Sequence, residues 1–89
     1  MTPGNEFEHE VYVTNRFKRS FKSLSEDVQQ RVMEKVQELS MKRITGKPLK
    51  GKFKDFKRIR VGKYRLIYSD KEPCRIYLYD IKLRETAYR

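Results

Sequence analysis

The sequence contains few of the residues on which disulfide and metal chemistry depends. Its 89 residues include one cysteine, Cys74, one histidine, His9, and no tryptophan. A single cysteine can form neither an intrachain disulfide nor a cysteine-based metal site, which favours a reducing compartment such as the cytoplasm. We therefore expect no metal and no small-molecule cofactor. His9 lies far in sequence from the basic residues described below, and we interpret it as a bystander rather than an acid or base.

Long apolar runs and negative charge are also scarce. No stretch approaches the roughly 20 residues that a membrane span requires, and residues 1–10 lack the charged and apolar regions of a signal peptide. We expect no membrane partner and a cytoplasmic location. Only 12 Asp and Glu oppose 22 Lys and Arg, which leaves a net charge of +10. This excess predicts a polyanionic partner and salt-sensitive association.

The length of the chain limits the size of its core. We expect a single domain over residues 1–89, with residues 1–6 as a loose lead-in containing Pro3 and Gly4. A domain of this size buries only about 60 to 65 per cent of the surface that its unfolded chain exposes. The core must therefore be thin, and one sheet covered on one side by helices satisfies that condition.

The stretch from Phe56 to Ser69 predicts a β-hairpin whose register follows from its turn. Gly62 occupies the first of two central turn positions, as a type II′ turn requires, because glycine enters positive φ there without strain. If Val61 faces Tyr64, the paired residues are Arg60 with Arg65, Ile59 with Leu66 and Arg58 with Ile67. Side chains alternate between the two faces of a strand. The predicted apolar face, which would pack on helices, consists of Lys57, Ile59, Val61, Tyr64, Leu66 and Tyr68.

The opposite face of the hairpin gathers three arginines, Arg58, Arg60 and Arg65. Like charges opposite each other are unfavourable: at about 5.5 Å the repulsion is on the order of 3 kcal/mol at an effective dielectric of 20, and under ~1 kcal/mol in water. We infer that an anion binds there, with a nucleic-acid backbone as the first candidate because guanidinium groups match phosphate oxygens. The alternative is that the arginines extend into solvent and protect an edge strand from pairing.

The remaining segments predict a β-α-α-β-β-β order. The expected elements are a strand over Phe7–Thr14, a helix from Thr14 or Asn15 to about Leu24, a second helix from Ser25 past Arg43 to a stop at Gly46, a basic loop over residues 47–55, and a last strand over Cys74–Ile81. The fold class is α+β, an antiparallel sheet of about four strands with a helical hairpin on one face. The first strand would lie at an edge. Tyr77 and Tyr79 would add aromatic platforms to the basic face, as in sites for single-stranded RNA.

Two motifs give the chain a family resemblance. Residues 60–65 read R-V-G-x-Y-R, and the tail from Arg84 to Tyr88 reads R-x-x-x-Y. With the helical run FKRSFKSLSEDVQQRVMEKV, these motifs resemble the RelE/ParE toxin superfamily over nearly the whole chain from Phe7 onward. The resemblance to the RelE branch implies a toxin of a type II toxin–antitoxin system. Such toxins are metal-independent endoribonucleases that cut messenger RNA on the ribosome, and each is held inactive by a RelB-like antitoxin.

The resemblance also implies roles for individual residues. Its catalytic positions correspond to Arg60, Arg65, Arg84 and Tyr88, and the RNA-binding residues would be Arg58, Lys57, Lys52, Lys54 and Tyr79. Arginine cannot act as a conventional general base because it stays protonated in proteins. Lys57, Tyr88 or a group of the ribosome would have to accept the proton, or the reaction would proceed on electrostatics and positioning. Two alternatives are a ParE-like inhibitor of DNA gyrase and a non-catalytic basic nucleic-acid-binding domain.

Overall fold

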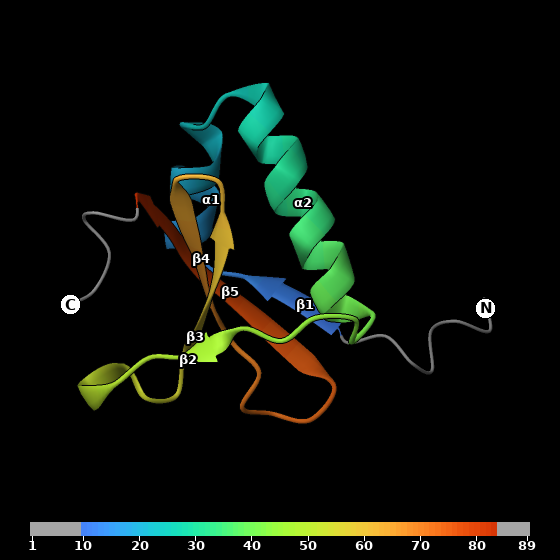
Figure 1. Ribbon diagram of the computed structural model, residues 1–89, viewed down its shortest axis with the longest axis vertical. Coiled ribbons are helices and arrows are strands. Elements are labelled where there is room, and N and C mark those ends of the chain that lie inside the picture. The colour runs from blue at the N-terminus through green and yellow to red at the C-terminus, as the bar shows by residue number, and fades with distance from the viewer. Residues whose placement is uncertain (1–9, 84–89) are drawn as a thin grey trace.

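The computed structural model describes residues 10–83 (Figure 1). The elements in chain order are β1 (Glu10–Val13), α1 (Asn15–Lys22), α2 (Glu26–Ser40), β2 (Lys47–Pro48), the 3-10 helix η2 (Gly51–Phe53), β3 (Lys57–Val61), β4 (Tyr64–Ser69) and β5 (Arg75–Leu83). The two helices pack on the same side of one sheet (Figure 1). None of the helices described is long and apolar enough to cross a membrane. The predicted α+β class is confirmed.

Within residues 10–83 the sheet has five strands in the order β1-β5-β4-β3-β2, one more than expected. The additional strand, β2, lies in the predicted loop and places Lys47 beside Arg58 and Pro48 beside Lys57. Proline is tolerated there because β2 is an edge strand. A second difference is that β1 pairs with β5 in parallel, whereas we expected an antiparallel sheet. Parallel neighbours need a long connection, and here several elements separate the two strands along the chain.

Local capping signals placed the start of each helix correctly. The Thr14 hydroxyl accepts a hydrogen bond from the Phe17 N–H at 3.0 Å, and the Ser25 hydroxyl accepts one from the Val28 N–H at 3.3 Å. Each cap satisfies a backbone donor that the first helical turn leaves without a partner. The first two residues of α2 are acidic, which is favourable at the positive end of a helix dipole.

The predicted end of the second helix at Gly46 is wrong. Helix α2 stops at Ser40, and Lys42 adopts the left-handed conformation with φ +61°. The Lys42 N–H donates to the Leu39 carbonyl at 3.0 Å and the Arg43 N–H donates to the Glu38 carbonyl at 2.9 Å. These two bonds form a Schellman motif, which ordinarily has glycine at the left-handed position. A lysine at this position does not indicate a helix end, so the stop at Ser40 could not be predicted from the sequence.

The core lies between the helices and the apolar face of the hairpin. Its buried members are Phe17, Val32, Val36, Leu39, Val61, Leu66, Tyr68, Ile76, Leu78 and Ile81. Helix α2 contributes Val32, Val36 and Leu39 to this core, whereas its Met33 is 49% exposed. Ile67 is also fully buried but lies outside this cluster, on the opposite face. The sheet thus buries a thin layer on the helix side, and on the other face Ile67 is buried beside its cross-strand partner Asp80.

The hairpin has the predicted register throughout. Val61 pairs with Tyr64, Arg60 with Arg65, Ile59 with Leu66 and Arg58 with Ile67. Gly62 has φ +61°, and Lys63 does not share this positive φ, as expected for a type II′ turn. The three arginines accordingly emerge on the face opposite the helices.

A β-bulge in β5 changes which side chains point to that face. Ile67 pairs with Asp80 and Tyr68 pairs with Leu78, so Tyr79 is the extra residue. Ile76 and Leu78, which precede the bulge, point into the core. After the bulge the core position falls on an odd-numbered residue, Ile81. Asp80 and Lys82 consequently lie on the same face as the arginines, because a bulge shifts the alternation by one residue.

Candidate functional site

A groove of about 500 Å³ lies along the β3 side of the sheet, beside the three arginines. Lys35 of α2 and the core-packed Ile44 and Ile59 line it from the helix side. Its charged lining is entirely cationic: Lys35 from α2, Lys47 from β2, Arg58 and Arg60 from β3, and Arg65 from β4. Gly46 and its neighbours complete the wall beside β3. The hairpin register therefore brings together the three arginines that the sequence predicted, and the fold adds two lysines from separate elements. A groove of this charge can hold an anion by several simultaneous contacts.

No carboxylate within residues 10–83 forms an ion pair with Arg58, Arg60 or Arg65. Arg60 is exposed and Arg65 is half-buried, so water screens their mutual repulsion only in part. The repulsion lies between the limits of under ~1 and about 3 kcal/mol given by water and an effective dielectric of 20. Bound phosphate would remove this repulsion, and its oxygens match the guanidinium donors.

The row of cations continues across the sheet to β5. Arg60 pairs with Arg65, and Arg65 pairs on its other side with Lys82. Lys82 was not among the residues predicted from the sequence, because unbroken alternation from Leu78 would have turned it toward the helices. The bulge at Tyr79 reverses that orientation. No local signal in the sequence indicates that bulge.

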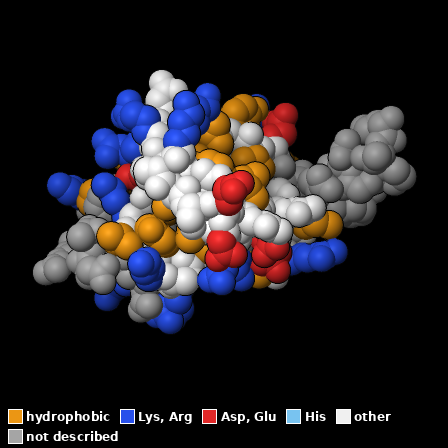
Figure 2. All heavy atoms as spheres, turned by 90° about the horizontal axis from the view of Figure 1, so that it is seen from above, with side chains coloured by type: hydrophobic (Ala, Val, Ile, Leu, Met, Phe, Trp, Pro, Cys, Tyr) orange, Lys and Arg blue, Asp and Glu red, His pale blue; other side chains and the backbone are white. Residues whose placement is uncertain are grey.

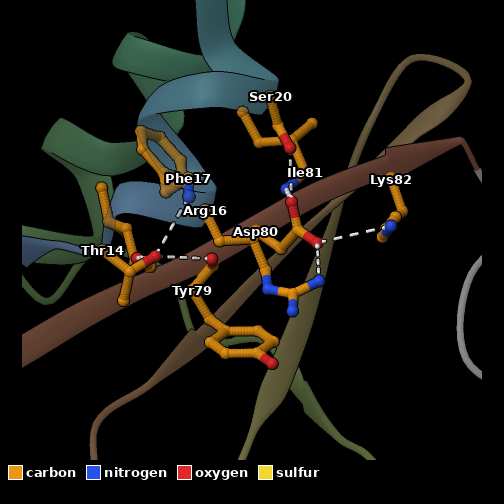
Figure 3. Close-up of polar contacts among 9 residues, drawn as sticks. Thr14, Arg16, Phe17, Ser20, Tyr79, Asp80, Ile81 and Lys82 are labelled. Atoms are coloured by element: carbon orange, nitrogen blue, oxygen red, sulfur yellow. Dashed lines mark hydrogen bonds and ion pairs between the residues drawn. The ribbon is translucent and has the colours of Figure 1, made fainter.

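Beside Lys82 lies a buried carboxylate, Asp80, that holds several groups together (Figure 3). Its Oδ1 accepts hydrogen bonds from the Ser20 hydroxyl at 2.6 Å and from the Ile81 N–H at 2.8 Å. Its Oδ2 lies 3.8 Å from Arg16 Nη1 and 3.6 Å from Lys82 Nζ. Sequence reasoning missed this cluster because its members come from α1 and from a bulged strand.

An aromatic cavity of about 370 Å³ lies beside the part of β5 that precedes the bulge. Phe56, Tyr77 and Tyr79 line it together with Lys71 and Glu72. Phe56 lies 4.9 Å from Tyr79 between ring centroids, and the Arg16 guanidinium lies 5.4 Å from the Tyr79 ring. Tyr77 stacks on Tyr12 at 5.1 Å. Tyr77 and Tyr79 thus line a cavity whose lining does not include the three arginines, whereas we expected them to add aromatic platforms to the basic face. Each ring also has a neighbour already.

The predicted lysines occupy different surroundings. The Lys57 ammonium donates to Asp70 Oδ2 at 2.9 Å, so its charge is already paired. Lys52 is exposed, with its ammonium 5.5 Å from the Phe53 ring, and Lys54 is exposed beside it. Both belong to the segment around η2 that projects from the sheet (Figure 1). Their proposed contacts with RNA stay predictions.

Arg84 and Tyr88, the predicted tail residues of the site, and His9 lie outside the described residues. Among residues 10–83, no group of three or more His, Cys, Asp or Glu side chains could hold a metal ion. In the space-filling view, Lys and Arg side chains occupy much of the visible surface and Asp and Glu are fewer (Figure 2). This agrees with the net charge of +10.

The sequence matches the family model for the ParE toxin of the type II toxin–antitoxin system parDE over residues 11–88. The chain therefore belongs to this family and is a toxin of the RelE/ParE type. No curated protein sequence matches it.

Solved structures show the same fold. The chain is similar to a structure of the toxin–antitoxin complex RelBE2 from Mycobacterium tuberculosis, with 26% identity and a TM-score of 0.75 over 86% of this chain and 99% of that one. It is also similar to the RelE–RelB complex of Pyrococcus horikoshii, with 24% identity, a TM-score of 0.66 and coverage of 90% and 99%. The isolated Escherichia coli RelE toxin matches with 22% identity, a TM-score of 0.69 and coverage of 89% and 87%. The last two likenesses concern the fold alone.

Proposed function

We propose that this toxin is a metal-independent endoribonuclease that cuts messenger RNA on the ribosome. The observation that carries the proposal is the groove in which Arg58, Arg60 and Arg65 lie on one face of the hairpin without a carboxylate ion pair among residues 10–83. Three guanidinium groups in the lining of one groove suit the charge that builds up on a phosphate during cleavage. The same guanidinium groups would also bind the RNA phosphate backbone before cleavage, so the groove accounts for both RNA affinity and catalysis.

The reaction uses a nucleophile that RNA itself supplies. The 2′-OH attacks the adjacent phosphorus, the bond to the 5′-oxygen breaks, and one proton leaves the nucleophile while another reaches the leaving oxygen. Arg60 and Arg65 would stabilise the extra negative charge of the pentavalent transition state. A donor preorganised for transition-state charge contributes on the order of 10²- to 10³-fold in rate. Holding the 2′-OH in line with the leaving oxygen contributes further, and the ribosome would assist by presenting the messenger.

Among the described residues, no histidine or carboxylate lines the groove, so its lining lacks the usual general bases for removing a proton from the 2′-OH. The Lys57 ammonium is engaged with Asp70 at 2.9 Å, which speaks against a role as base. Arginine does not deprotonate in proteins. We propose that this toxin supplies electrostatic stabilisation and geometry, while Tyr88 or a group of the ribosome accepts the proton. Cleavage of free RNA should therefore be slow compared with cleavage of ribosome-bound messenger.

A cognate RelB-like antitoxin is the proposed protein partner. The similar structures from Mycobacterium tuberculosis and Pyrococcus horikoshii are complexes of a toxin with its antitoxin. The cationic groove, with five Lys and Arg side chains in its lining, would be neutralised by an acidic segment of such a partner. The reading frame next to this gene should encode that acidic segment.

The test is inducible expression of Arg65→Ala with mapping of messenger 5′ ends. We expect loss of growth arrest and at least about a hundredfold less cleavage, from the loss of one preorganised donor. Arg43→Ala is the matched control, because Arg43 is exposed beyond the end of α2 and does not line the groove. Unchanged cleavage in Arg65→Ala, with the fold intact, would reject the site.

Inhibition of DNA gyrase is the second candidate function, and the match to the ParE toxin model favours it. The same expression experiment separates the two candidates. Ribosome-dependent messenger cuts support the nuclease, whereas DNA damage that disappears in a gyrase-resistant host supports the gyrase inhibitor. Salt-sensitive RNA binding with neither effect would indicate a basic binding domain without catalysis.

A further inference from the structure

The Asp80 carboxylate is fully buried, and only one of its two oxygens has hydrogen-bond partners among residues 10–83. Its side chain is 1% exposed. Oδ1 receives two hydrogen bonds, from the Ser20 hydroxyl and the Ile81 N–H (Figure 3). Oδ2 is a buried acceptor for which no donor within residues 10–83 lies in hydrogen-bonding range. Leaving a charged acceptor unsatisfied is unfavourable, so a compensating charge must lie nearby.

Two cations from different elements provide that compensation. Arg16 of α1 and Lys82 of β5 approach Oδ2 to 3.8 and 3.6 Å, and Figure 3 shows both side chains directed at it. Both distances exceed ordinary hydrogen-bond lengths, so the carboxylate attracts the cations without occupying a donor of either. The Arg16 side chain remains 50% exposed and that of Lys82 38% exposed. Their N–H donors are therefore available to a ligand.

The position of this pair relative to the groove suggests what that ligand is. Lys82 is the cross-strand neighbour of Arg65, so it continues the row that begins with Arg60 and Arg65. Arg16 extends the row beyond the edge of β5, where its guanidinium also lies over the Tyr79 ring at 5.4 Å. Asp80 supplies one negative charge against two positive ones, which leaves the cluster net positive. A polyanion bound at the arginines would meet a second cationic contact along its backbone.

We propose that Arg16 and Lys82, held in place by Asp80, form a second phosphate-binding site for the RNA strand bound at Arg60 and Arg65. This inference rests on the proposed function. Asp80 is a positioning residue in it: its Oδ1 bonds set the orientation of the carboxylate, and its Oδ2 draws the two cations toward each other. The ligand is a backbone phosphate next to the one at the arginines, bound without regard to base sequence.

The test measures how RNA affinity depends on salt. The logarithm of the binding constant falls linearly with the logarithm of salt concentration, with a slope of about −0.7 for each phosphate contact on a single strand. A fluorescein-labelled single-stranded oligouridylate is titrated with wild-type toxin, Arg16→Gln, Lys82→Gln and the double variant. We expect a slope shallower by about 0.7 in each single variant and by about 1.4 in the double variant. Lys18→Gln is the control, since Lys18 is an exposed residue of α1 outside the cluster.

The variant Asp80→Asn distinguishes a positioning role of Asp80 from a purely electrostatic effect of its negative charge. The asparagine Oδ1 can still accept from Ser20 and Ile81, but the amide donors would then point at Arg16 and Lys82. The substitution raises the net charge by one, so a general electrostatic role predicts tighter RNA binding. The positioning role predicts weaker binding and a shallower slope. Circular dichroism reports whether this variant folds, and if it does not, the variants of the two exposed cations decide the question.

Running Arg65→Ala in parallel keeps this inference distinct from the proposed function. Shallower slopes in the Arg16 and Lys82 variants and in Arg65→Ala, with no change in Lys18→Gln, support the second site. Shallower slopes in the Arg16 and Lys82 variants with an unchanged Arg65→Ala overturn it, because the RNA is then not bound at the arginines. A shallower slope for Arg65→Ala alone overturns the second site and leaves the proposed function standing. Slopes that all match wild type reject both. Unchanged RNA binding with weakened antitoxin binding in the Arg16 and Lys82 variants also overturns the inference, and assigns the cluster to the antitoxin.

Discussion

Replacing Gly46 with alanine should destabilise the toxin severely, because the chain approaches β3 and Tyr68 too closely at this residue. A Cβ built there would lie 2.5 Å from the Arg58 carbonyl oxygen and 2.9 Å from the Tyr68 ring and hydroxyl. The Gly46 N–H also donates to the Tyr68 hydroxyl at 2.7 Å. Tyr68 is fully buried and one wall of the collision is backbone, so neither neighbour can move aside easily.

The expected magnitude has two parts. Overpacking of a well-packed site costs about 1 to 3 kcal/mol, and loss of the hydrogen bond would leave buried polar groups unsatisfied at about 1 to 3 kcal/mol more. We expect a loss of about 2 to 6 kcal/mol from a total unfolding free energy on the order of 4 to 13 kcal/mol for a chain of this length. With a urea m-value of about 1 kcal/mol/M, the midpoint should fall by about 2 to 6 M.

Urea unfolding followed by circular dichroism measures this loss. Gly51→Ala is the matched control: nothing lies within 4 Å of its added Cβ, although its φ of +68° disfavours alanine by about 1 to 2 kcal/mol. Tyr68→Phe removes only the hydroxyl and should lose about 1 to 2 kcal/mol. If Gly46→Ala is no less stable than Gly51→Ala, the close approach of this segment to β3 is not a feature of the native state.

Three further outcomes are expected. Lys42→Gly should raise the unfolding free energy by about 0.5 to 1 kcal/mol in urea titrations, because φ is +61° there; a loss of stability would contradict the left-handed stop of α2. Burial raises the pKa of Tyr68 above its ordinary value of about 10, so the stability that its neutral form contributes is present below pH 10 and is lost as pH rises through the folded-state pKa. Alkaline unfolding of Tyr68→Phe should lack this component, and identical pH profiles would contradict its assignment to Tyr68. Arg60→Gln should raise the thermal midpoint slightly at low salt by relieving repulsion from Arg65, while RNA binding weakens; a gain that persists in about 1 M salt would argue against electrostatics.

Features that depend on a few neighbouring residues were predictable from the chain. The hairpin register followed from the position of Gly62 in a two-residue turn, and the starts of both helices followed from Thr14 and Ser25. In each case the energy involved is local: a backbone conformation that suits glycine, or a hydroxyl that accepts from a nearby N–H. Three of the predicted site residues, Arg58, Arg60 and Arg65, were placed together for this reason.

Features that join distant segments were not predictable in the same way. The parallel pairing of β1 with β5 depends on where the helices return the chain, and the bulge at Tyr79 depends on matching β5 to two neighbouring strands at once. The Schellman stop at Lys42 defeats the expectation that glycine marks a helix end. The sequence therefore offered no reason to choose Asp80, Arg16 or Lys82 as members of one cluster.

Composition and local pattern alone were enough to establish a small basic α+β domain whose hairpin turns three guanidinium groups to one side, because charge is additive and strand alternation is a property of the backbone. Only the assembled sheet decided that Lys82 would join that side and that a buried Asp80 would draw Arg16 from the first helix toward it. The reason is physical: a one-residue bulge reverses every side chain beyond it, and whether a bulge forms depends on strands that meet only in the folded protein.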